Sequence, residues 1–166
     1  MDARLNLIYS RRSIRRFEPR ALPPELVEEL LQAAMAAPSA NNRQPWQFLV
    51  ITATDLREEV SRRHPHAAFA REAGAVFVIF GKPETELFEQ DLCAATENLL
   101  IAVAGLGLGA CWCGMTEARR PSIHQLTGIP EDHRIVSMVC VGYPAEQKEP
   151  RTQYDASKVH WERYGG

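Results

Sequence analysis

The stretch Ala75-Val76-Phe77-Val78-Ile79-Phe80-Gly81 contains no polar side chain. A run of this length, rich in β-branched and aromatic residues, is typical of a strand buried on both faces of a sheet. We therefore predict a strand at residues 75–81 and place the rest of the fold around it.

Helices and strands alternate on both sides of this segment. Helices are predicted at residues 2–10, 23–36, 54–63, 84–104 and 117–127, and further strands at 46–52, 110–114 and 134–143. This alternation indicates one sheet domain of α/β or α+β class that spans residues 1–166.

More specific expectations concern the first helix, the strand at 46–52 and the C-terminal tail. The first helix is expected to turn Leu5, Ile8 and Tyr9 inward, and the strand at 46–52 to be buried on both faces. The polar tail from residue 144 to 166 is too long to be a frayed end, so we expect it to wrap a neighbouring molecule.

The composition is that of an ordinary globular protein, with 45% hydrophobic and 24% charged residues and a formal net charge of -2. Domains that bind nucleic acid are usually basic, so neither nucleic acid nor a membrane is an expected partner. The N-terminus has no apolar signal core, which predicts a cytoplasmic protein. Residues 98–116 carry no charge, but glycines interrupt them, so we expect a buried helix, a turn and a strand there.

The four cysteines are interpreted as structural, and no metal site is expected. None of them has zinc-finger spacing, although Cys111 and Cys113 point to the same side of a strand, which could suit a metal or a disulfide. Small core residues in a reducing compartment are the favoured interpretation. His64 and His66 are likewise interpreted as exposed loop residues.

The glycine run at residues 105–109 resembles part of a nucleotide-binding loop, but its order is wrong. A dinucleotide loop follows a strand and opens a helix, whereas this run ends a predicted helix and enters a predicted strand. It therefore indicates a turn.

Residues 11–17, RRSIRRF, place four arginines and a serine in seven positions. Guanidinium and hydroxyl groups bind phosphate oxygens through charge-assisted hydrogen bonds. A solvated basic turn explains the same pattern, so this segment alone leaves an anion site and a surface patch open.

Residues 38–46, PSANNRQPW, concentrate amide side chains just before a predicted strand. Amides offer both donors and acceptors, so they can bind the polar edge of a heterocycle. Asparagine and proline also favour ordinary turns, and from the pattern alone a capped turn is the favoured interpretation.

Taken together, these segments resemble the flavin-dependent nitroreductase family. RRSIRRF, APSANNRQPWQF, LGLGACWCGM and GYPAEQKEPR follow one another in the family's order over nearly the whole chain. The resemblance implies an α+β fold, a nitroreductase-like three-layer α-β-α sandwich with a central mixed sheet flanked by helices. It also implies a homodimer with a swapped C-terminal tail and one FMN at each subunit interface.

The resemblance assigns the phosphate end of FMN to two basic segments. Arg11, Arg12 and Ser13 would bind the phosphate and the nearby ribityl oxygens, and Lys148 and Arg151 would close over the phosphate.

The flavin ring is assigned to a different set of residues. Arg15 would lie near the ribityl chain or the pyrimidine edge, where its charge would stabilise the reduced, anionic flavin. Cys113 and Gly114 would present backbone groups to N5 and O4, with Cys111 and Trp112 beside the ring.

A third set would reach the flavin from the other subunit. Pro38, Ser39, Ala40 and Asn42 match these family positions, and Gln44 matches a motif position without an assigned contact.

The sequence departs from the larger relatives in two ways. Cys113 stands where many of them carry glutamate, and a lysine and an asparagine near the flavin pyrimidine have no aligned counterpart. Arg62, Arg63 and Arg71 are the unassigned candidates for that region. The short chain also leaves little room for a helical insertion, which implies an open active site.

The implied function is that of an FMN-dependent NAD(P)H oxidoreductase that reduces nitroaromatics, quinones or related electron-poor acceptors. Flavin N5 would carry the hydride in a ping-pong scheme, so no side chain is assigned as a catalytic acid or base. The alternative is an FMN storage or redox-sensing protein with little turnover.

Overall fold

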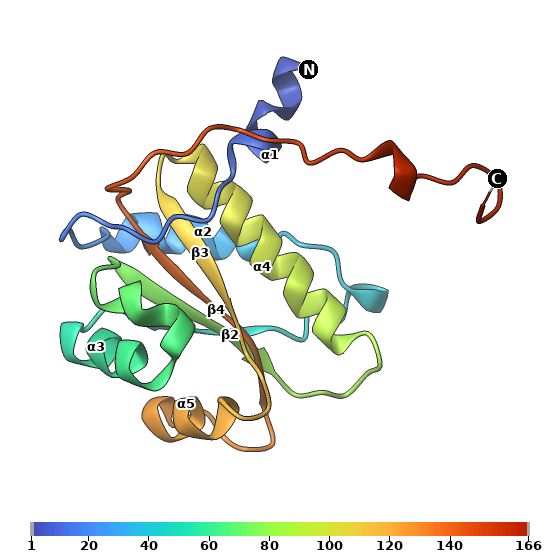
Figure 1. Ribbon diagram of the computed structural model, residues 1–166. Coiled ribbons are helices and arrows are strands. Elements are labelled where there is room, and N and C mark those ends of the chain that lie inside the picture. The colour runs from blue at the N-terminus through green and yellow to red at the C-terminus, as the bar shows by residue number, and fades with distance from the viewer. Residues whose placement is uncertain (1, 166) are drawn as a thin grey trace.

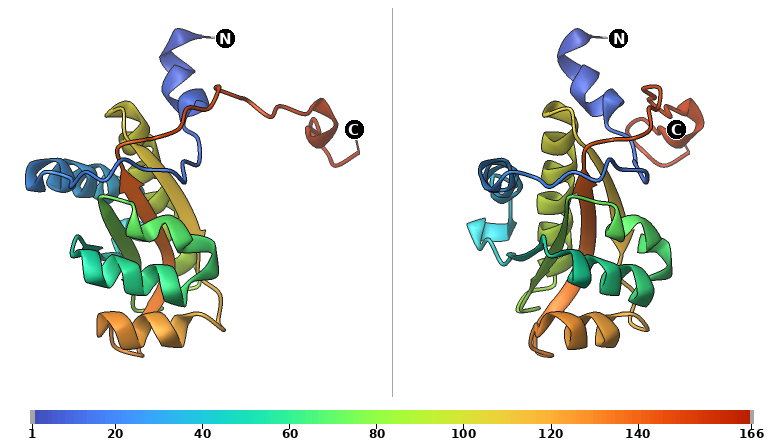
Figure 2. Two further views of the ribbon diagram at one scale, coloured as in Figure 1. Left: turned by 60° about the vertical axis from the view of Figure 1, so that its left-hand side comes forward. Right: turned by 90° about the vertical axis from the view of Figure 1, so that its left-hand side faces the viewer.

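A computed structural model describes residues 2–165 as three layers, helix on sheet on helix (Figures 1 and 2). The sheet has the strand order β1-β2-β4-β3. Its strands are β1 (Gln47–Ile51), β2 (Ala75–Gly81), β3 (Gly109–Gly114) and β4 (Arg134–Gly142). The α+β class and the three-layer sandwich are therefore confirmed.

The prediction of a mixed sheet is wrong, because all three strand pairs are antiparallel. The segments between β1 and β2, and between β3 and β4, each return the chain antiparallel to the strand it left. Among residues 2–165, parallel pairing is confined to one isolated bridge between Ser13 and Ala110.

Helices α2 (Pro24–Met35) and α4 (Phe88–Gly105) cover one face of the sheet. Helix α3 (Thr54–Arg63), the 3-10 segment η3 (Pro65–Arg71) and helix α5 (Arg120–Thr127) cover the other. The right-hand view in Figure 2 shows these two layers with the sheet between them.

Strand alternation divides the core between the layers. Phe77 and Ile79 of β2 face α4, whereas Val76 and Val78 face α3 and α5. All seven residues of β2 are buried, as the uninterrupted apolar run predicts. In contrast, β1 is an edge strand, and only Ile51 of its five residues is buried, so the prediction of burial on both faces is wrong there.

The N-terminal segment also differs from the prediction. The 3-10 turn η1 (Ala3–Leu5) leads into α1 (Asn6–Ser10), which confirms a helix, but Leu5 and Ile8 are 43% and 54% exposed. An apolar face thus lies on the surface of the single chain.

Beyond residue 151, the tail runs away from the body of the domain and includes the 3-10 turn η4 (Ala156–Lys158) (Figure 1). Tyr154, Trp161 and Tyr164 are 75%, 74% and 92% exposed. The predicted wrapping around a neighbour stays a prediction.

The uncharged stretch 98–116 divides into the end of α4, a turn and β3, as predicted. Gly107 has a φ of 70°, a left-handed conformation that glycine adopts without a steric penalty. Within residues 2–165, no helix is both long and apolar enough to span a membrane.

Candidate functional site

The arginine segment lies along the outer edge of β3. Ser13 forms the bridge with Ala110, and the Ile14 amide donates to the Ala110 carbonyl at 2.8 Å. This close approach requires a glycine at the start of β3, because a Cβ atom on Gly109 would lie 2.7 Å from Cγ2 of Ile14. We call residues 11–17 the basic arm.

The first half of the basic arm lines a small cavity of about 160 Å³ beside the end of α4. Arg11 and Arg12 share it with Lys148 of the tail, so three of the residues assigned to the phosphate come together. Lys148 Nζ also donates to the Ser13 carbonyl at 2.6 Å, which holds the tail against the arm.

Protein groups already contact the cations around this cavity. Arg11 Nε lies 3.4 Å from a Glu97 carboxylate oxygen, and the Arg12 guanidinium donates to the Glu149 carbonyl. Arg151 does not line the cavity, although its amide donates to the Tyr9 carbonyl at 3.1 Å.

A second, larger pocket of about 600 Å³ lies along β3. Its walls include Arg15, Cys111, Trp112, Cys113 and Gly114, which are the residues assigned to the flavin ring. A Cβ atom added to Gly114 would meet nothing within 4 Å, so the backbone there is open to the pocket. We call this space the β3 pocket.

The two thiols of the β3 pocket are buried. Hydrogen bonding with Cys113 and burial raise the pKa of the Cys111 thiol. The bond to Cys111 opposes a rise at Cys113, but hydrogen bonding with Cys140 and burial outweigh it, so its pKa is raised as well. Protonated thiols are poor nucleophiles and poor metal ligands, and no group of potential metal ligands occurs within residues 2–165.

His64 lies below the pocket floor, and the prediction that it is exposed is wrong. Its side chain is fully buried, with Nε2 3.1 Å from the Gly114 carbonyl. Burial is the main cause that lowers its pKa, and the nearby charge of Arg119 acts in the same direction. A neutral ring that donates from Nε2 therefore fixes the Gly114 peptide, whereas exposed His66 lines the pocket itself.

The pocket also contains residues that the sequence reasoning missed, including Phe69, Met115 and Arg119. Met115 is the last residue of the quoted segment LGLGACWCGM, which is a signal that could have found it. Phe69 reaches the pocket from η3, and no local pattern marks this tertiary contact.

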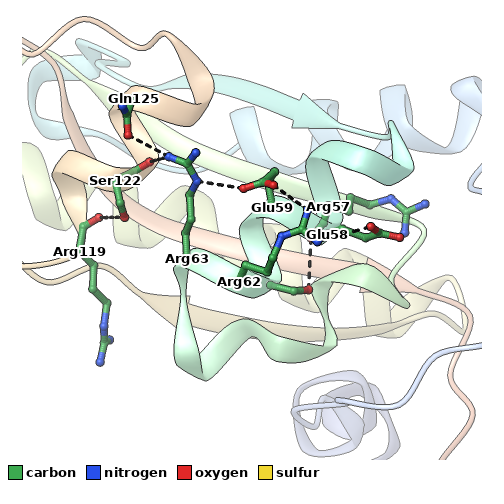
Figure 3. Close-up of polar contacts among 9 residues, drawn as sticks. Arg57, Glu58, Glu59, Arg62, Arg63, Arg119, Ser122 and Gln125 are labelled. Atoms are coloured by element: carbon green, nitrogen blue, oxygen red, sulfur yellow. Dashed lines mark hydrogen bonds and ion pairs between the residues drawn. The ribbon is translucent and has the colours of Figure 1, made fainter.

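The three arginines considered for the middle of the chain do not reach the pocket. Arg63 donates to the Ser122 carbonyl and to Gln125, both at 3.1 Å, and so links α3 to α5 (Figure 3). Arg62 pairs with Glu59, and Arg71 lies beside Glu72. Ion pairs of this kind are typical of exposed side chains on helices and turns.

The segment from Pro38 to Gln44 forms a separate turn at the other end of α4. The Ala40 amide donates to Oδ1 of Asp91 at 2.9 Å, and the Gln44 amide donates to Ser39 Oγ at the same distance. Asn42 and Gln44 have φ values of 54° and 50°, which define a tight turn. We call residues 38–44 the amide turn.

Within one chain, the amide turn does not meet the basic arm. Asp91 holds the turn, whereas Leu100 and Ala104 of the same helix line the cavity of the arm. At 1.5 Å per residue, nine to thirteen residues of helix separate the turn from the cavity by about 14–20 Å, and six residues, about 9 Å, separate it from Glu97, where Arg11 contacts the helix.

These observations define an α+β domain with a cationic cavity and an aromatic pocket connected by one extended arm. A family model described as "Nitroreductase family" matches residues 8–64 and 57–143. The chain belongs to the nitroreductase family, whose members are oxidoreductases.

Individual relatives agree with this assignment. An Archaeoglobus fulgidus protein named "Putative NADH dehydrogenase/NAD(P)H nitroreductase" is 35% identical, over 99% of this chain and 100% of that protein. A crystal structure of a protein with the same name from Bacteroides thetaiotaomicron has a TM-score of 0.93 at 28% identity and covers 99% of both chains. A Desulfovibrio desulfuricans structure described as a "putative nitroreductase in complex with FMN" has a TM-score of 0.87 at 27% identity and covers 98% of both chains.

Proposed function

We propose that this protein is an FMN-dependent NAD(P)H oxidoreductase that reduces nitroaromatics, quinones or similar electron-poor acceptors. One observation carries the proposal: the basic arm contributes cations both to the small cavity and to the β3 pocket. A phosphate and a flat heterocycle joined by a short flexible chain match these two sites. The FMN complex of the Desulfovibrio relative supports the choice of ligand.

The chemistry of the residues fits FMN at both ends. Arg11, Arg12 and Lys148 supply the donors that a phosphate needs. Trp112 offers an apolar surface, and the open backbone at Gly114 leaves room for a ring edge to approach. We therefore assign the phosphate to the small cavity and the ring to the β3 pocket.

Bound FMN would supply hydride transfer, taking a hydride from a nicotinamide and passing it to the acceptor in a ping-pong scheme. The chain's own residues bind the cofactor and orient it. Arg15 places positive charge in the β3 pocket, where it favours an anionic reduced cofactor. His64 holds the Gly114 peptide from below, so the backbone at the pocket floor keeps one orientation.

We further propose that the active form is a homodimer in which the amide turn of one subunit completes the site of the other, and in which the C-terminal tails are exchanged. The position of the amide turn supports this, because it lies about 14–20 Å along α4 from the cavity that the arm lines. The exposed apolar groups of the first helix and the tail provide surface for an interface.

The test of cofactor binding is the visible spectrum of the purified protein, followed by anaerobic addition of NADH or NADPH. We expect a flavin spectrum that bleaches. Arg12→Ala should lose most of its flavin, whereas Arg16→Ala, which changes an exposed arginine of the same arm, should retain it. Retention of flavin by Arg12→Ala would contradict the phosphate assignment, and a spectrum that does not bleach would indicate storage rather than turnover.

Mixing variants tests the shared site. Arg12→Ala damages the arm and Asn42→Ala damages the amide turn, so neither homodimer has an intact site. A mixed dimer concentrates both changes in one site and leaves the other intact. Recovery of flavin binding after subunit exchange supports the two-chain site, and no recovery in a verified mixed dimer contradicts it.

A further inference from the structure

We propose that Arg119 binds an anionic substituent of the acceptor, so that the enzyme prefers aromatic acceptors that carry a carboxylate. This inference rests on the proposed function and deepens it by naming a substrate class.

The β3 pocket has a positive lining. Among the described residues that form its walls are Arg15, His66 and Arg119, and none of the lining residues is an aspartate or a glutamate. A pocket whose described lining carries two arginines and no carboxylate favours an anionic ligand.

The two arginines lie at different parts of the pocket. The arm runs parallel to β3 from the bridge between Ser13 and Ala110, which brings Arg15 level with Trp112, near the middle of the strand. Arg119 lies in the turn beyond Gly114, past the end of the strand. Since the proposed function uses Arg15 for the cofactor, a second guanidinium remains for a second ligand.

Arg119 is held in place by its backbone. Its amide donates to the Thr116 carbonyl at 2.9 Å, and its carbonyl accepts from Ser122 Oγ at 3.0 Å. The side chain is half-buried and points away from the contacts of Arg63 with Ser122 and Gln125 (Figure 3). A fixed turn therefore presents the guanidinium to the pocket.

Neighbouring arginines, in contrast, are engaged in structural contacts. Arg120 donates to the Ile135 carbonyl at 3.0 Å and pairs with Glu117, and Arg63 bonds to Glu59 and Gln125. Within residues 2–165, no hydrogen bond or ion pair is formed by the Arg119 side chain. A half-buried guanidinium that makes no polar contact among the described residues suits a ligand-binding group.

The apolar lining of the pocket determines which ring of the acceptor fits. Phe69 and Met115 provide aromatic and apolar surface, which favours a flat ring. A planar guanidinium binds a carboxylate through two parallel hydrogen bonds, a geometry that an uncharged amide cannot match. A nitrobenzoate meets both requirements.

The redox step balances without any further reactant. NAD(P)H gives up a hydride and solvent gives a proton, and the nitro group gains two electrons. One N–O bond breaks, water leaves, and a nitroso group remains while NAD(P)⁺ is formed.

The test compares 4-nitrobenzoate with its uncharged counterpart 4-nitrobenzamide in steady-state assays. The wild-type protein should favour the benzoate in kcat/KM, and Arg119→Gln should lose about tenfold on the benzoate while changing less than twofold on the amide. The tenfold loss corresponds to the lower end of the range expected for a hydrogen bond to a charged group. Arg16→Gln is the matched control and should behave as wild type.

A binding measurement makes the test independent of turnover. Benzoate and benzamide are titrated into the purified proteins by calorimetry, and benzoate should bind the wild-type protein more tightly than it binds Arg119→Gln. Equal benzoate affinity in the two proteins overturns the proposal. An effect of Arg119→Gln confined to the KM of NADPH also overturns the proposal, because it would assign the guanidinium to a phosphate group of NADPH.

The spectrum of each protein separates this proposal from the proposed function. A colourless protein, or one that NADH and NADPH do not bleach, refutes the flavin assignment whatever Arg119 does. A normal flavoprotein that does not distinguish the benzoate from the amide refutes the Arg119 assignment alone.

Discussion

Replacing His64 with glutamine should remove an acid-sensitive component of stability. His64 is fully buried, donates from Nε2 to the Gly114 carbonyl, and has no partner within residues 2–165 for its buried Nδ1. Burial is the main cause that lowers its pKa from 6.5, and the neighbouring Arg119 and His66 act in the same direction. The folded protein therefore excludes a proton that the unfolded chain binds.

The direction and size of the effect follow from proton linkage. Above pH 6.5 the ring is neutral in both states, so its contribution to stability is fully present. As the pH falls through 6.5 toward the lower folded pKa, the unfolded chain takes up the proton and the free energy of unfolding decreases. The loss is at most about 1.4 kcal/mol for each pH unit in this window.

Glutamine is a useful replacement because its amide can still donate to the Gly114 carbonyl, yet it does not titrate. Urea unfolding at pH 7.5 and 5.5 measures the free energy of unfolding of the wild type, His64→Gln and His66→Gln at one protein concentration. We expect His64→Gln to lose less stability at pH 5.5 than wild type. His66→Gln changes an exposed ring two residues away and should follow wild type.

Carboxylates also titrate in acid, but they are common to all three proteins and cancel in the comparison. An acid loss in His64→Gln equal to that of wild type would refute the reasoning. A reduced loss in His66→Gln instead would place the titrating group on the surface of the pocket.

Two further substitutions test how the fold holds the site. Gly109→Ala should lower the free energy of unfolding by about 1–3 kcal/mol, because its Cβ would clash with Ile14, and should release the basic arm; thermal melts check this against Gly114→Ala, whose Cβ meets nothing within 4 Å. Asp91→Ala removes the acceptor of the Ala40 amide and should make the amide turn exchange its amide hydrogens faster, with a cost of about 1–3 kcal/mol. Asp91→Asn keeps an acceptor oxygen and is the control, which should exchange these hydrogens as slowly as wild type. If exchange in Asp91→Ala is also unchanged, this contact does not hold the turn.

The sequence predicted those features that depend on contiguous residues. The bounds of β2 are found as predicted because seven successive apolar residues leave a helix or loop little support. Helix α4 begins at Phe88 rather than at residue 84, because residues 84–87 turn before the helix starts. The motif segments of the arm and of β3 were also predicted, because each motif consists of a few contiguous residues.

Features that depend on distant partners could not be predicted. A histidine beside a proline in a polar stretch looks exposed, and nothing local shows that Gly114, fifty residues away, supplies the carbonyl that lets His64 be buried. The approach of Phe69 and Arg119 to one pocket depends on how η3 and the turn after β3 pack against the sheet. Strand direction also needed the structure, because alternating helices and strands are compatible with parallel and antiparallel returns.

The arrangement around α4 supports the proposed two-chain site. The helix is a rigid spacer that carries the amide turn near Asp91 and the cavity of the basic arm near Ala104. Bending or sliding the turn to close about 14–20 Å would break its bond to a buried carboxylate, which is costly because Asp91 is only 7% exposed. In the proposed dimer, a second copy related by a twofold axis would remove the difficulty, since the turn of each subunit would reach the arm of the other. The same symmetry would create two equivalent sites at once, and it would give the exposed first helix and the extended tail a common surface to cover.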